Sequence, residues 1–158
     1  MKISDLPAVL QIQTHCYPPE LIESEAALAS RHALAPESCW VAAHRTVLGY
    51  LFSHPWQGEH APALDTPLTA LPQDADTLFI HDLALHPQGR GQGLAPKLID
   101  AAFQTARRQG LRYSRLVAVQ GASHFWSRHG YRTQDALKAG DYYGEGAKVM
   151  GRTLEAAT

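Results

Sequence analysis

Residues 78–95 of this chain read LFIHDLALHPQGRGQGLA, and two kinds of secondary structure meet within them. The first half, Leu78–Leu85, is a nearly continuous apolar run, which is typical of a strand covered on both faces. Pro87 ends this run, and a glycine-rich turn follows it. From Leu94 onward apolar residues recur at intervals of three and four positions, which predicts an amphipathic helix. The segment therefore predicts a strand, a turn and a helix in direct succession.

Helical and strand patterns alternate on both sides of this segment. On its N-terminal side we expect two helices and a hairpin, at 4–17, about 20–32, and 39–43 with 47–52. On its C-terminal side we expect a strand, a short helix and a final strand pair, at 116–119, 123–129, and 131–133 with 147–154. Residues 55–76 lack periodicity and predict a long surface loop, a candidate for part of a substrate lid. This order indicates a mixed α/β fold in a single domain over residues 1–158.

The bulk composition restricts the class of protein. A formal net charge of -1, with basic residues that are scattered apart from Arg107-Arg108, argues against a nucleic-acid-binding protein. Cys16 and Cys39 form no CxxC motif, so we expect buried thiols in a reducing compartment. No apolar stretch is long enough to span a bilayer, and the N-terminus lacks the apolar core of a signal peptide. We therefore expect a cytoplasmic protein that binds neither nucleic acid nor membrane.

The glycine-rich turn has the properties of an anion-binding site. Main-chain N–H groups at the start of a helix lack partners and carry partial positive charge, and glycines let the backbone approach an anion closely. The order Gly89, Gly91, Gly93 completes neither the dinucleotide fingerprint G-x-G-x-x-G nor a P-loop, which requires G-K-[ST]. The spacing that is present is Gln88-x-x-Gly91-x-Gly93, with Arg90 as a nearby cation.

Two segments resemble the motifs of a known family. Residues 83–95, LALHPQGRGQGLA, are similar to the acetyl-CoA motif of the GCN5-related N-acetyltransferases, the GNAT family, whose pattern is [QR]-x-x-G-x-[GA] after a strand end of the L-A-V-H-P type. Residues 123–131, SHFWSRHGY, resemble the family's second signature, which ends F-Y-x-x-x-G-F. The resemblance covers about the last half of the chain, and the first half fits only by its two helices and hairpin. The family usually opens with a strand, for which only Met1–Ile3 is available.

The resemblance implies a GNAT-like fold, with a mostly antiparallel central sheet flanked by helices and strands that splay apart at the cofactor site. It implies acetyl-CoA as co-substrate, its arm lying in that gap like an extra strand along main-chain groups of Leu83 and Leu85. The amides of residues 88–95 would hold the pyrophosphate. The implied cofactor-binding residues are Leu83, Ala84, Leu85, Gln88, Gly89, Arg90, Gly91, Gln92, Gly93, Leu94, Ala95 and Trp126.

Acetyl transfer to an amine requires a base, because an amine of pKa near 10 is mostly protonated at neutral pH. His81 is the candidate catalytic base, since alternation along a strand places it on the same face as Leu83 and imidazole titrates close to neutral pH. Its position also resembles that of a proton-relay histidine in the arylalkylamine acetyltransferase branch of the family. The alternative is a hydrogen-bonded core histidine. Asp82 would then point to the opposite face, in a structural role.

The departing thiolate also benefits from a proton. The family often uses the Tyr of its F-Y pair, but Trp126 stands there, and an indole N–H does not release its proton at useful pH. Tyr142 is the candidate catalytic acid, with Tyr143, Ser123, His124 or water as alternatives. The histidines of the chain show no metal-ligand spacing, so we predict no metal.

The expected acceptor is a primary amine of a small molecule or peptide. Its walls would come from residues 16–25, 56–76 and 140–146, whose acidic bias suits a cationic amine. The Trp at position 126 keeps open a non-catalytic acyl-CoA binding or sensing domain on the same fold. A third hypothesis is a nucleotide-phosphate-binding protein of another fold. A homodimer is also left open.

Overall fold

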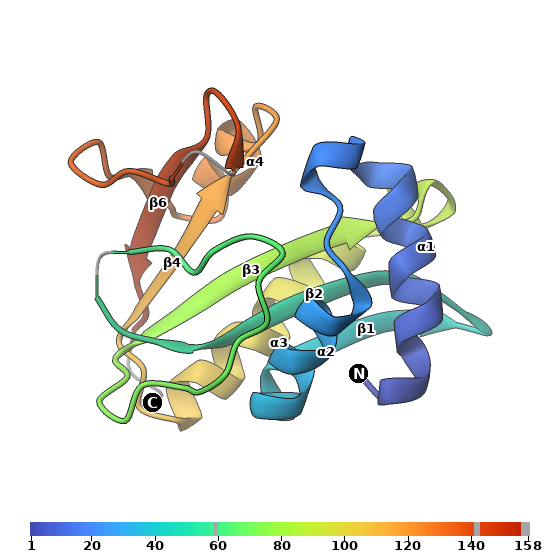
Figure 1. Ribbon diagram of the computed structural model, residues 1–158, viewed down its shortest axis with the longest axis horizontal. Coiled ribbons are helices and arrows are strands. Elements are labelled where there is room, and N and C mark those ends of the chain that lie inside the picture. Colours follow the sequence, from blue (N-terminus) through green and yellow to red (C-terminus); the bar gives the residue numbers. More distant parts are fainter. Residues whose placement is uncertain (59, 141–142, 156–158) are drawn as a thin grey trace.

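A six-stranded sheet runs through the molecule and carries helices on both faces (Figure 1). The computed structural model describes residues 1–58, 60–140 and 143–155. The strands lie in the order β1-β2-β3-β4-β6-β5, and β3 and β4 are parallel whereas every other neighbouring pair is antiparallel. Their bounds are β1 Cys39–His44, β2 Thr46–Trp56, β3 Thr77–Leu85, β4 Tyr113–Ala118, β5 Arg132–Thr133 and β6 Lys148–Thr153. The expected mixed and mostly antiparallel sheet is confirmed.

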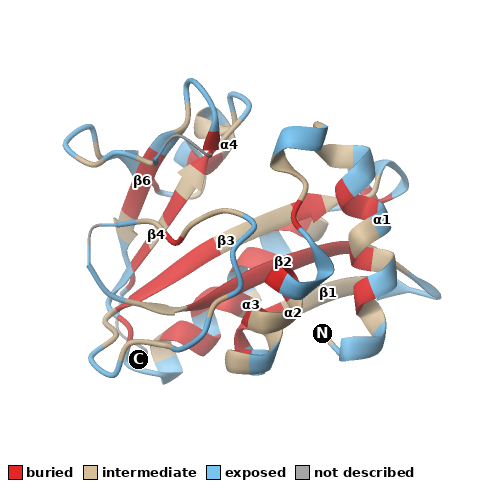
Figure 2. Cartoon of the chain, in the orientation of Figure 1, coloured by how far each residue is buried: buried red, intermediate tan, exposed pale blue. Residues whose placement is uncertain are grey.

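The helices divide between the two faces of this sheet. The α-helices are α1 Leu6–Cys16, α2 Glu25–Leu34, α3 Leu94–Arg108 and α4 Ser123–Ser127. Short 3-10 helices lie between them: η1 Ile3–Asp5, η2 Pro19–Leu21, η3 Pro36–Ser38 and η4 Pro87–Gly89. Successive side chains of β2 point to opposite faces, so Tyr50 and Phe52 pack with α1 and α2 whereas Leu51 packs with α3. Figure 2 shows the resulting buried band through the middle of β2 and β3.

One expectation for the N-terminal region is wrong. The second helix begins at Glu25 and not near Glu20, because Ser24 caps it by accepting a hydrogen bond from the Ala27 N–H. Residues 22–24 are consequently non-helical, which places Glu23 in the connection between η2 and α2. No strand forms in the first described residues, where Ile3 begins η1.

Two irregularities of β3 create the site. Opposite β2, Phe52 pairs with Asp82 and the next residue, Ser53, pairs with Ile80, so His81 is an extra residue in a β-bulge. On the other side, the pairing of β3 with β4 ends at Ile80 and Leu116 although both strands continue. Beyond that point the two strands diverge (Figure 1), as the resemblance implied. The second half of β3 thus has β2 on one edge and an open gap on the other.

Candidate active site

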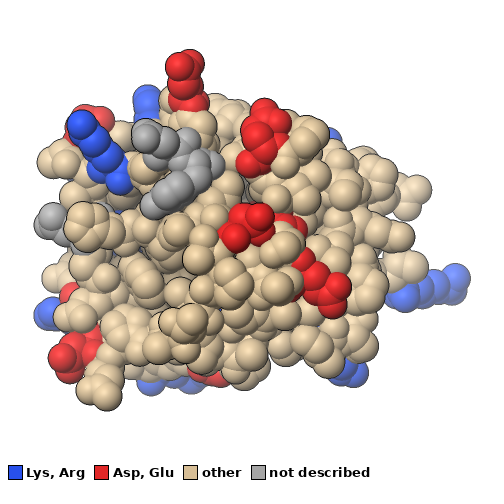
Figure 3. All heavy atoms as spheres, in the orientation of Figure 1, with Lys and Arg blue, Asp and Glu red and all other residues tan. Residues whose placement is uncertain are grey.

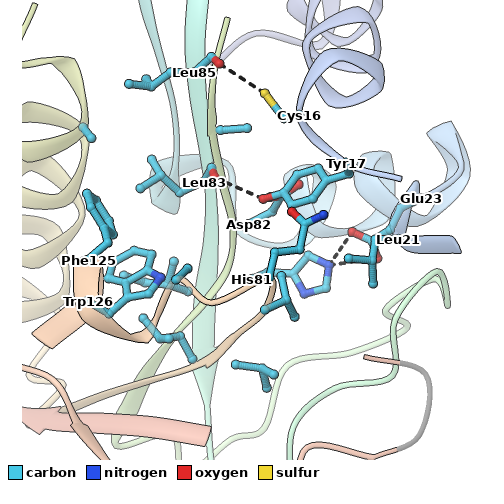
Figure 4. A pocket seen from close by; sticks show the side chains of 18 of the residues that line it. Cys16, Tyr17, Leu21, Glu23, His81, Asp82, Leu83, Leu85, Phe125 and Trp126 are labelled. Atoms are coloured by element: carbon cyan, nitrogen blue, oxygen red, sulfur yellow. Dashed lines mark hydrogen bonds and ion pairs between the residues drawn. The ribbon is translucent and has the colours of Figure 1, made fainter. Parts of the chain in front are cut away.

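A cavity of about 410 Å³ opens where β3 and β4 part. Its two walls differ in chemistry (Figure 4). On the side of α1 and η2 the lining includes Tyr17, Glu23 and His81, which are polar. On the side of α4 it includes Phe125 and Trp126, which are apolar. A slot with one apolar and one ionisable wall can hold an apolar arm while exposing its end to acid and base groups.

His81 and Glu23 form a buried hydrogen-bonded pair at this cavity, which becomes an ion pair when the ring of His81 is protonated. The Nε2 atom of His81 lies 2.7 Å from Oε2 and 2.9 Å from Oε1 of Glu23, and the two side chains are 0% and 2% exposed. Burial alone raises the pKa of Glu23, but the charge of His81 and the hydrogen bonds from His81 and from the Asp65 N–H outweigh it. The net pKa of Glu23 therefore lies below its ordinary value, and the carboxylate form is favoured.

The pairing leaves one nitrogen of His81 available. A carboxylate only accepts hydrogen bonds, so Nε2 of His81 carries the hydrogen in this pair. In the neutral ring the other nitrogen, Nδ1, then holds a lone pair. Nδ1 is buried and has no hydrogen-bond partner in the part of the chain that the structure describes. His81 can therefore accept a proton at Nδ1 while Glu23 stabilises the resulting cation.

The expected distribution of side chains along β3 is wrong at one step. Regular alternation predicts that His81 shares a face with Leu83 and that Asp82 lies on the other face. The bulge interrupts the alternation, so His81 and Asp82 both point toward the α1 and α2 side, where they meet Glu23 and Tyr17. Leu83 packs on the α3 side. Figure 4 shows Asp82 and Leu83 on opposite sides of the strand.

Asp82 is bound by two tyrosine hydroxyls. Tyr17 donates to Oδ1 at 2.6 Å, and Tyr50 donates to Oδ2 at 2.7 Å. Burial raises the pKa of Asp82 to about 6, although the hydrogen bonds from both tyrosines act in the opposite direction. Burial and the neighbouring carboxylate also raise the pKa of Tyr17 well above its ordinary value. Asp82 thus belongs to a buried acidic network and is not only a packing residue.

The open edge of β3 is formed by the main chain of Leu83 and Leu85. The His86 N–H donates to the Leu48 carbonyl toward β2, at 2.8 Å, and main-chain groups alternate in direction along a strand. Leu83 and Leu85 therefore face the gap. The Leu83 carbonyl oxygen lies 3.2 Å from Tyr17 Oη, and the Leu85 carbonyl oxygen accepts from Cys16 Sγ at 3.1 Å. The structure places both leucines beside the gap, as predicted. The contacts of Cys16 and Tyr17 with their carbonyl groups were not predicted.

The glycine-rich turn offers fewer amides than expected. The N–H groups of residues 88, 89 and 90 already donate to His86 Nδ1, to the His86 carbonyl and to the Pro87 carbonyl, which closes η4. Within the described ranges, the N–H groups of residues 91–95 donate to no protein atom. Gly93 is the N-cap of α3, and no side chain caps that helix. The candidate anion site is therefore Gly91–Ala95, shorter than the predicted 88–95.

The glycines of this turn meet two different requirements. Gly91 and Gly93 have φ values of 74° and 71°, a region that disfavours any residue with a Cβ. Gly89 is buried, and a Cβ there would lie 2.8 Å from the Leu48 carbonyl oxygen. Gln92 donates from Nε2 to the Gln88 carbonyl at 2.7 Å, which ties the turn together.

The predicted cofactor residues fall into two groups in space. Six line the cavity: Leu83, Ala84, Leu85, Arg90, Ala95 and Trp126. The others continue from its end as the exposed turn, the buried Gly89 and the half-buried first residue of α3: Gln88, Gly89, Gly91, Gln92, Gly93 and Leu94. Arg90 reaches back toward α1, with Nη2 3.9 Å from Cys16 Sγ. Trp126 is buried and also packs on Tyr131, with ring centroids 5.4 Å apart.

The long loop after β2 is tied to α2. Arg31 is fully buried and donates to the carbonyls of Ala63 and Thr66, at 3.2 and 3.0 Å. Tyr143, an alternative acid in the sequence analysis, donates to the Pro62 carbonyl at 2.5 Å. These bonds favour a fixed wall over a lid. Tyr142, the predicted catalytic acid, lies outside the described residues.

Sequence reasoning placed Glu23 and Tyr17 in the acceptor wall, within residues 16–25, but missed their contacts with His81 and Asp82. The sequence pattern predicts Glu23 inside a helix, as one of several acidic residues near the acceptor. The signal that could have corrected this is Ser24, whose type favours a helix cap and so an extended Glu23. Nothing local points to the contact with His81, which is 58 positions away in the chain.

In the described part of the chain, no group of three or more His, Cys, Asp or Glu side chains is placed to hold a metal ion. None of the described helices is both long and apolar enough to cross a membrane.

Comparisons with known proteins agree with this geometry. The family model described as "Acetyltransferase (GNAT) family" matches residues 6–131. No curated protein sequence matches the chain significantly. Among solved structures, GphF, a GNAT-like decarboxylase in complex with isobutyryl-CoA, has a TM-score of 0.78 at 19% identity, covering 98% of this chain and 97% of that one. The loading GNATL domain of CurA from Lyngbya majuscula has a TM-score of 0.79 at 12% identity, covering 98% and 95%. The ribosomal-protein-S18-alanine N-acetyltransferase from Escherichia coli has a TM-score of 0.68 at 16% identity, covering 100% and 93%.

Proposed function

The chain belongs to the GNAT family of acetyltransferases, and from this premise we propose that it transfers an acetyl group from acetyl-CoA to a primary amine of a small molecule or peptide. One observation carries the proposal. The unpartnered His81 Nδ1 and the unused amides of Gly91–Ala95 belong to the same strand–turn–helix unit, and the open edge of β3 joins them. An anion-binding end, an arm-length gap and a base are the parts that this reaction requires.

The cofactor residues keep the roles that the resemblance implies. The free amides of Gly91–Ala95, at the positive end of a 15-residue helix, suit a pyrophosphate. Leu83 and Leu85 present main-chain groups to an extended arm in the manner of a neighbouring strand. Phe125 and Trp126 supply the apolar wall. GphF holds isobutyryl-CoA on the same fold, which supports an acyl-CoA as the ligand.

His81 performs the base step. Acetyl-CoA supplies a thioester carbonyl that a neutral amine can attack. His81 takes a proton from the incoming ammonium at Nδ1, and Glu23 stabilises the imidazolium that forms. The Leu83 N–H faces the gap and donates to the carbonyl oxygen as negative charge develops on it. The neutral amine then forms the C–N bond, its nitrogen gives up a second proton to water, and the C–S bond breaks with its electron pair on sulfur. Tyr142 remains a prediction for the group that protonates the sulfur.

The acceptor side is electrostatically negative. Glu23 and Asp82 contribute carboxyl groups to the cavity. Acidic side chains are also more prominent than basic ones over the middle of the face that carries α1, α2 and the long loop (Figure 3). A cationic amine gains from this field, whereas an acyl group that itself carries a carboxylate is repelled. On this ground we place amine acetylation ahead of the decarboxylation for which GphF is named.

A second candidate is a non-catalytic acyl-CoA binding or sensing domain. Trp126 favours it, because the usual acid of the family is missing at that position. The buried and oriented His81–Glu23 pair favours catalysis. Burying two ionisable side chains costs free energy, and buried ionisable pairs beside a cavity are typical of functional sites. Thiol release with amines separates the two, since a sensor binds coenzyme A without turnover.

The test is an acceptor panel with acetyl-CoA, scored by thiol release and product mass. With the best acceptor, His81→Ala should lower kcat by roughly 10²- to 10⁴-fold while the Kd for coenzyme A changes little. His44→Ala, an exposed histidine at the end of β1, is the control and should match the parent. Equal activity of His81→Ala and parent across pH 6 to 9 would remove His81 from the mechanism.

A further inference from the structure

The hydroxyl of Tyr17 has more acceptors than protons. It lies 2.6 Å from Asp82 Oδ1 and 3.2 Å from the Leu83 carbonyl oxygen. A phenol has a single proton, so it donates to one of these acceptors at a time. Because the distance to Asp82 is the shorter one and Asp82 is negatively charged when ionised, Tyr17 donates its hydrogen bond to Asp82. The carbonyl of Leu83 then receives no hydrogen from Tyr17.

Protonation of Asp82 reverses the direction of the hydrogen bond between Tyr17 and Asp82. A neutral carboxyl group is itself a donor, and the hydroxyl oxygens of Tyr17 and Tyr50 are its bonded neighbours. Once Asp82 donates to the Tyr17 oxygen, the Tyr17 proton is free to point at the Leu83 carbonyl or at a ligand atom in the gap. Because burial raises the pKa of Asp82 to about 6, both states are accessible near neutral pH.

The position of Tyr17 along the gap matches one end of the cofactor arm. The anion site follows the C-terminal end of β3, so an arm that starts there passes Leu85 first and Leu83 second. The two residues are about 7 Å apart along a strand. Cys16 binds the carbonyl of Leu85, in the middle of the path, whereas Tyr17 Oη lies 3.2 Å from that of Leu83, nearer the His81 base. Tyr17 therefore lies at the reacting end.

We propose that Tyr17 protonates the departing thiolate and that Asp82 resupplies the Tyr17 proton, an inference that rests on the proposed acetyl transfer. As the C–S bond breaks, its electron pair stays on sulfur, which takes the Tyr17 proton. The Asp82 proton moves to the Tyr17 oxygen, and the Asp82 carboxylate is reprotonated from water. Tyr50 acts as a positioning residue that holds the second carboxyl oxygen. Position 126 then needs no acidic side chain, which accounts for a tryptophan there.

The first test compares kcat, with acetyl-CoA and the best amine, for the parent and single variants. Tyr17→Phe should lower kcat by roughly 10²-fold or more while the Kd for coenzyme A stays within about threefold, which also shows that the variant is folded. Asp82→Asn keeps an acceptor for Tyr17 but has no carboxyl proton, and its kcat should fall in the same direction. The exposed Tyr113→Phe is the control and should match the parent. A full kcat in Tyr17→Phe, with the loss found in Tyr142→Phe, would transfer the role to Tyr142.

The second test varies the leaving group. S-acetyl-4-nitrothiophenol releases an acidic thiol that departs without a proton, so the ratio of parent to Tyr17→Phe rates should approach one with this donor. The loss of rate in His81→Ala should persist with this donor, because the amine must still lose a proton before it attacks. An equal loss in Tyr17→Phe with both donors would make Tyr17 a substrate-positioning residue and overturn the relay. Coenzyme A binding without turnover of any amine by the parent would instead overturn the proposed function, and the relay with it.

Discussion

At the residue scale, the chemistry of the site depends on how few of its polar atoms are left without a partner. Glu23 uses one oxygen for both the His81 ring and the Asp65 N–H and the other for His81 alone. Asp82 uses both oxygens for tyrosine hydroxyls. The Nδ1 atom of His81 has no described partner, although it is buried. Since such an atom is costly to bury, we interpret it as the place where a substrate proton arrives.

The first prediction concerns Glu23. Glu23→Gln keeps an acceptor for His81 and for the Asp65 N–H but removes the negative charge that stabilises an imidazolium. We expect kcat to fall by roughly 10²-fold with little change in the Kd for coenzyme A, measured by steady-state kinetics and calorimetry. Glu20→Gln, an exposed carboxylate in the preceding η2, is the matched control. If both variants lose activity equally, the net charge of the segment matters and the pair with His81 does not.

The second prediction concerns the stability contributed by Asp82. Its pKa is raised from 3.8 to about 6 in the folded protein, so the native state binds the proton more tightly than the unfolded state does. The contribution of Asp82 to stability is therefore greatest below about pH 4, falls as the pH rises, and is lost above about pH 6. Relative to the parent, Asp82→Asn should gain up to about 3 kcal/mol between pH 4 and pH 8.

Denaturant unfolding of parent and Asp82→Asn at both pH values measures this difference. Any pH-independent cost of the amide cancels when the two pH values are compared. A constant difference between the two proteins would show that Asp82 titrates normally in the fold. Asp82 would then lower the stability of the fold at neutral pH and supply the proton that the relay requires.

At the scale of elements, one strand does most of the positioning. The bulge at His81 turns two consecutive ionisable side chains toward α1 and α2, and the loss of pairing with β4 opens the opposite edge to a ligand. The same strand ends in the turn that starts α3, so the anion site and the base are separated by a rigid length of backbone. Sites built in this way hold their geometry better than sites built on loops.

The third prediction tests the start of α3. Gly91→Asp places a carboxylate against the expected phosphate and strains a residue at φ 74°. Like-charge contact costs several kcal/mol, so we expect the affinity for coenzyme A to fall by at least about 100-fold in calorimetry. Gly110→Asp is the matched control, because Gly110 has φ 78° and equally open surroundings at the other end of the helix. Similar losses of affinity in both variants would point to backbone strain and away from a phosphate site.

At the scale of the whole molecule, the site joins parts that are distant in the chain. The α1 and η2 region supplies Cys16, Tyr17 and Glu23, the middle supplies β3 and its turn, and the region after β4 supplies Phe125 and Trp126. The sheet holds these parts together through two hydrophobic clusters, one on each face. A ligand that bridges all three parts should therefore stabilise the fold as one unit.

The fourth prediction follows from this bridging. Coenzyme A at about 100 times its Kd should add about 2.7 kcal/mol to the free energy of unfolding, which raises Tm by roughly 5 to 10 °C for a domain of this size. ATP and NAD at the same concentration should give almost no shift in differential scanning fluorimetry. A shift with ATP or NAD and none with coenzyme A would favour the nucleotide-phosphate-binding alternative.

Local patterns of apolar residues and glycines were enough to predict the strand, turn and helix of residues 78–108, the mixed α/β order and the family. They did not predict which amides of the turn stay free, since His86 and Pro87 use three of them in forming η4. Nor did they predict the bulge, which exists only relative to the pairing with β2. The partnership of Glu23 with His81 and the network around Asp82 join residues that only the folded sheet brings together. These features depend on burial and cross-strand register, which are properties of the assembled core and cannot be predicted from the spacing of residues along the chain.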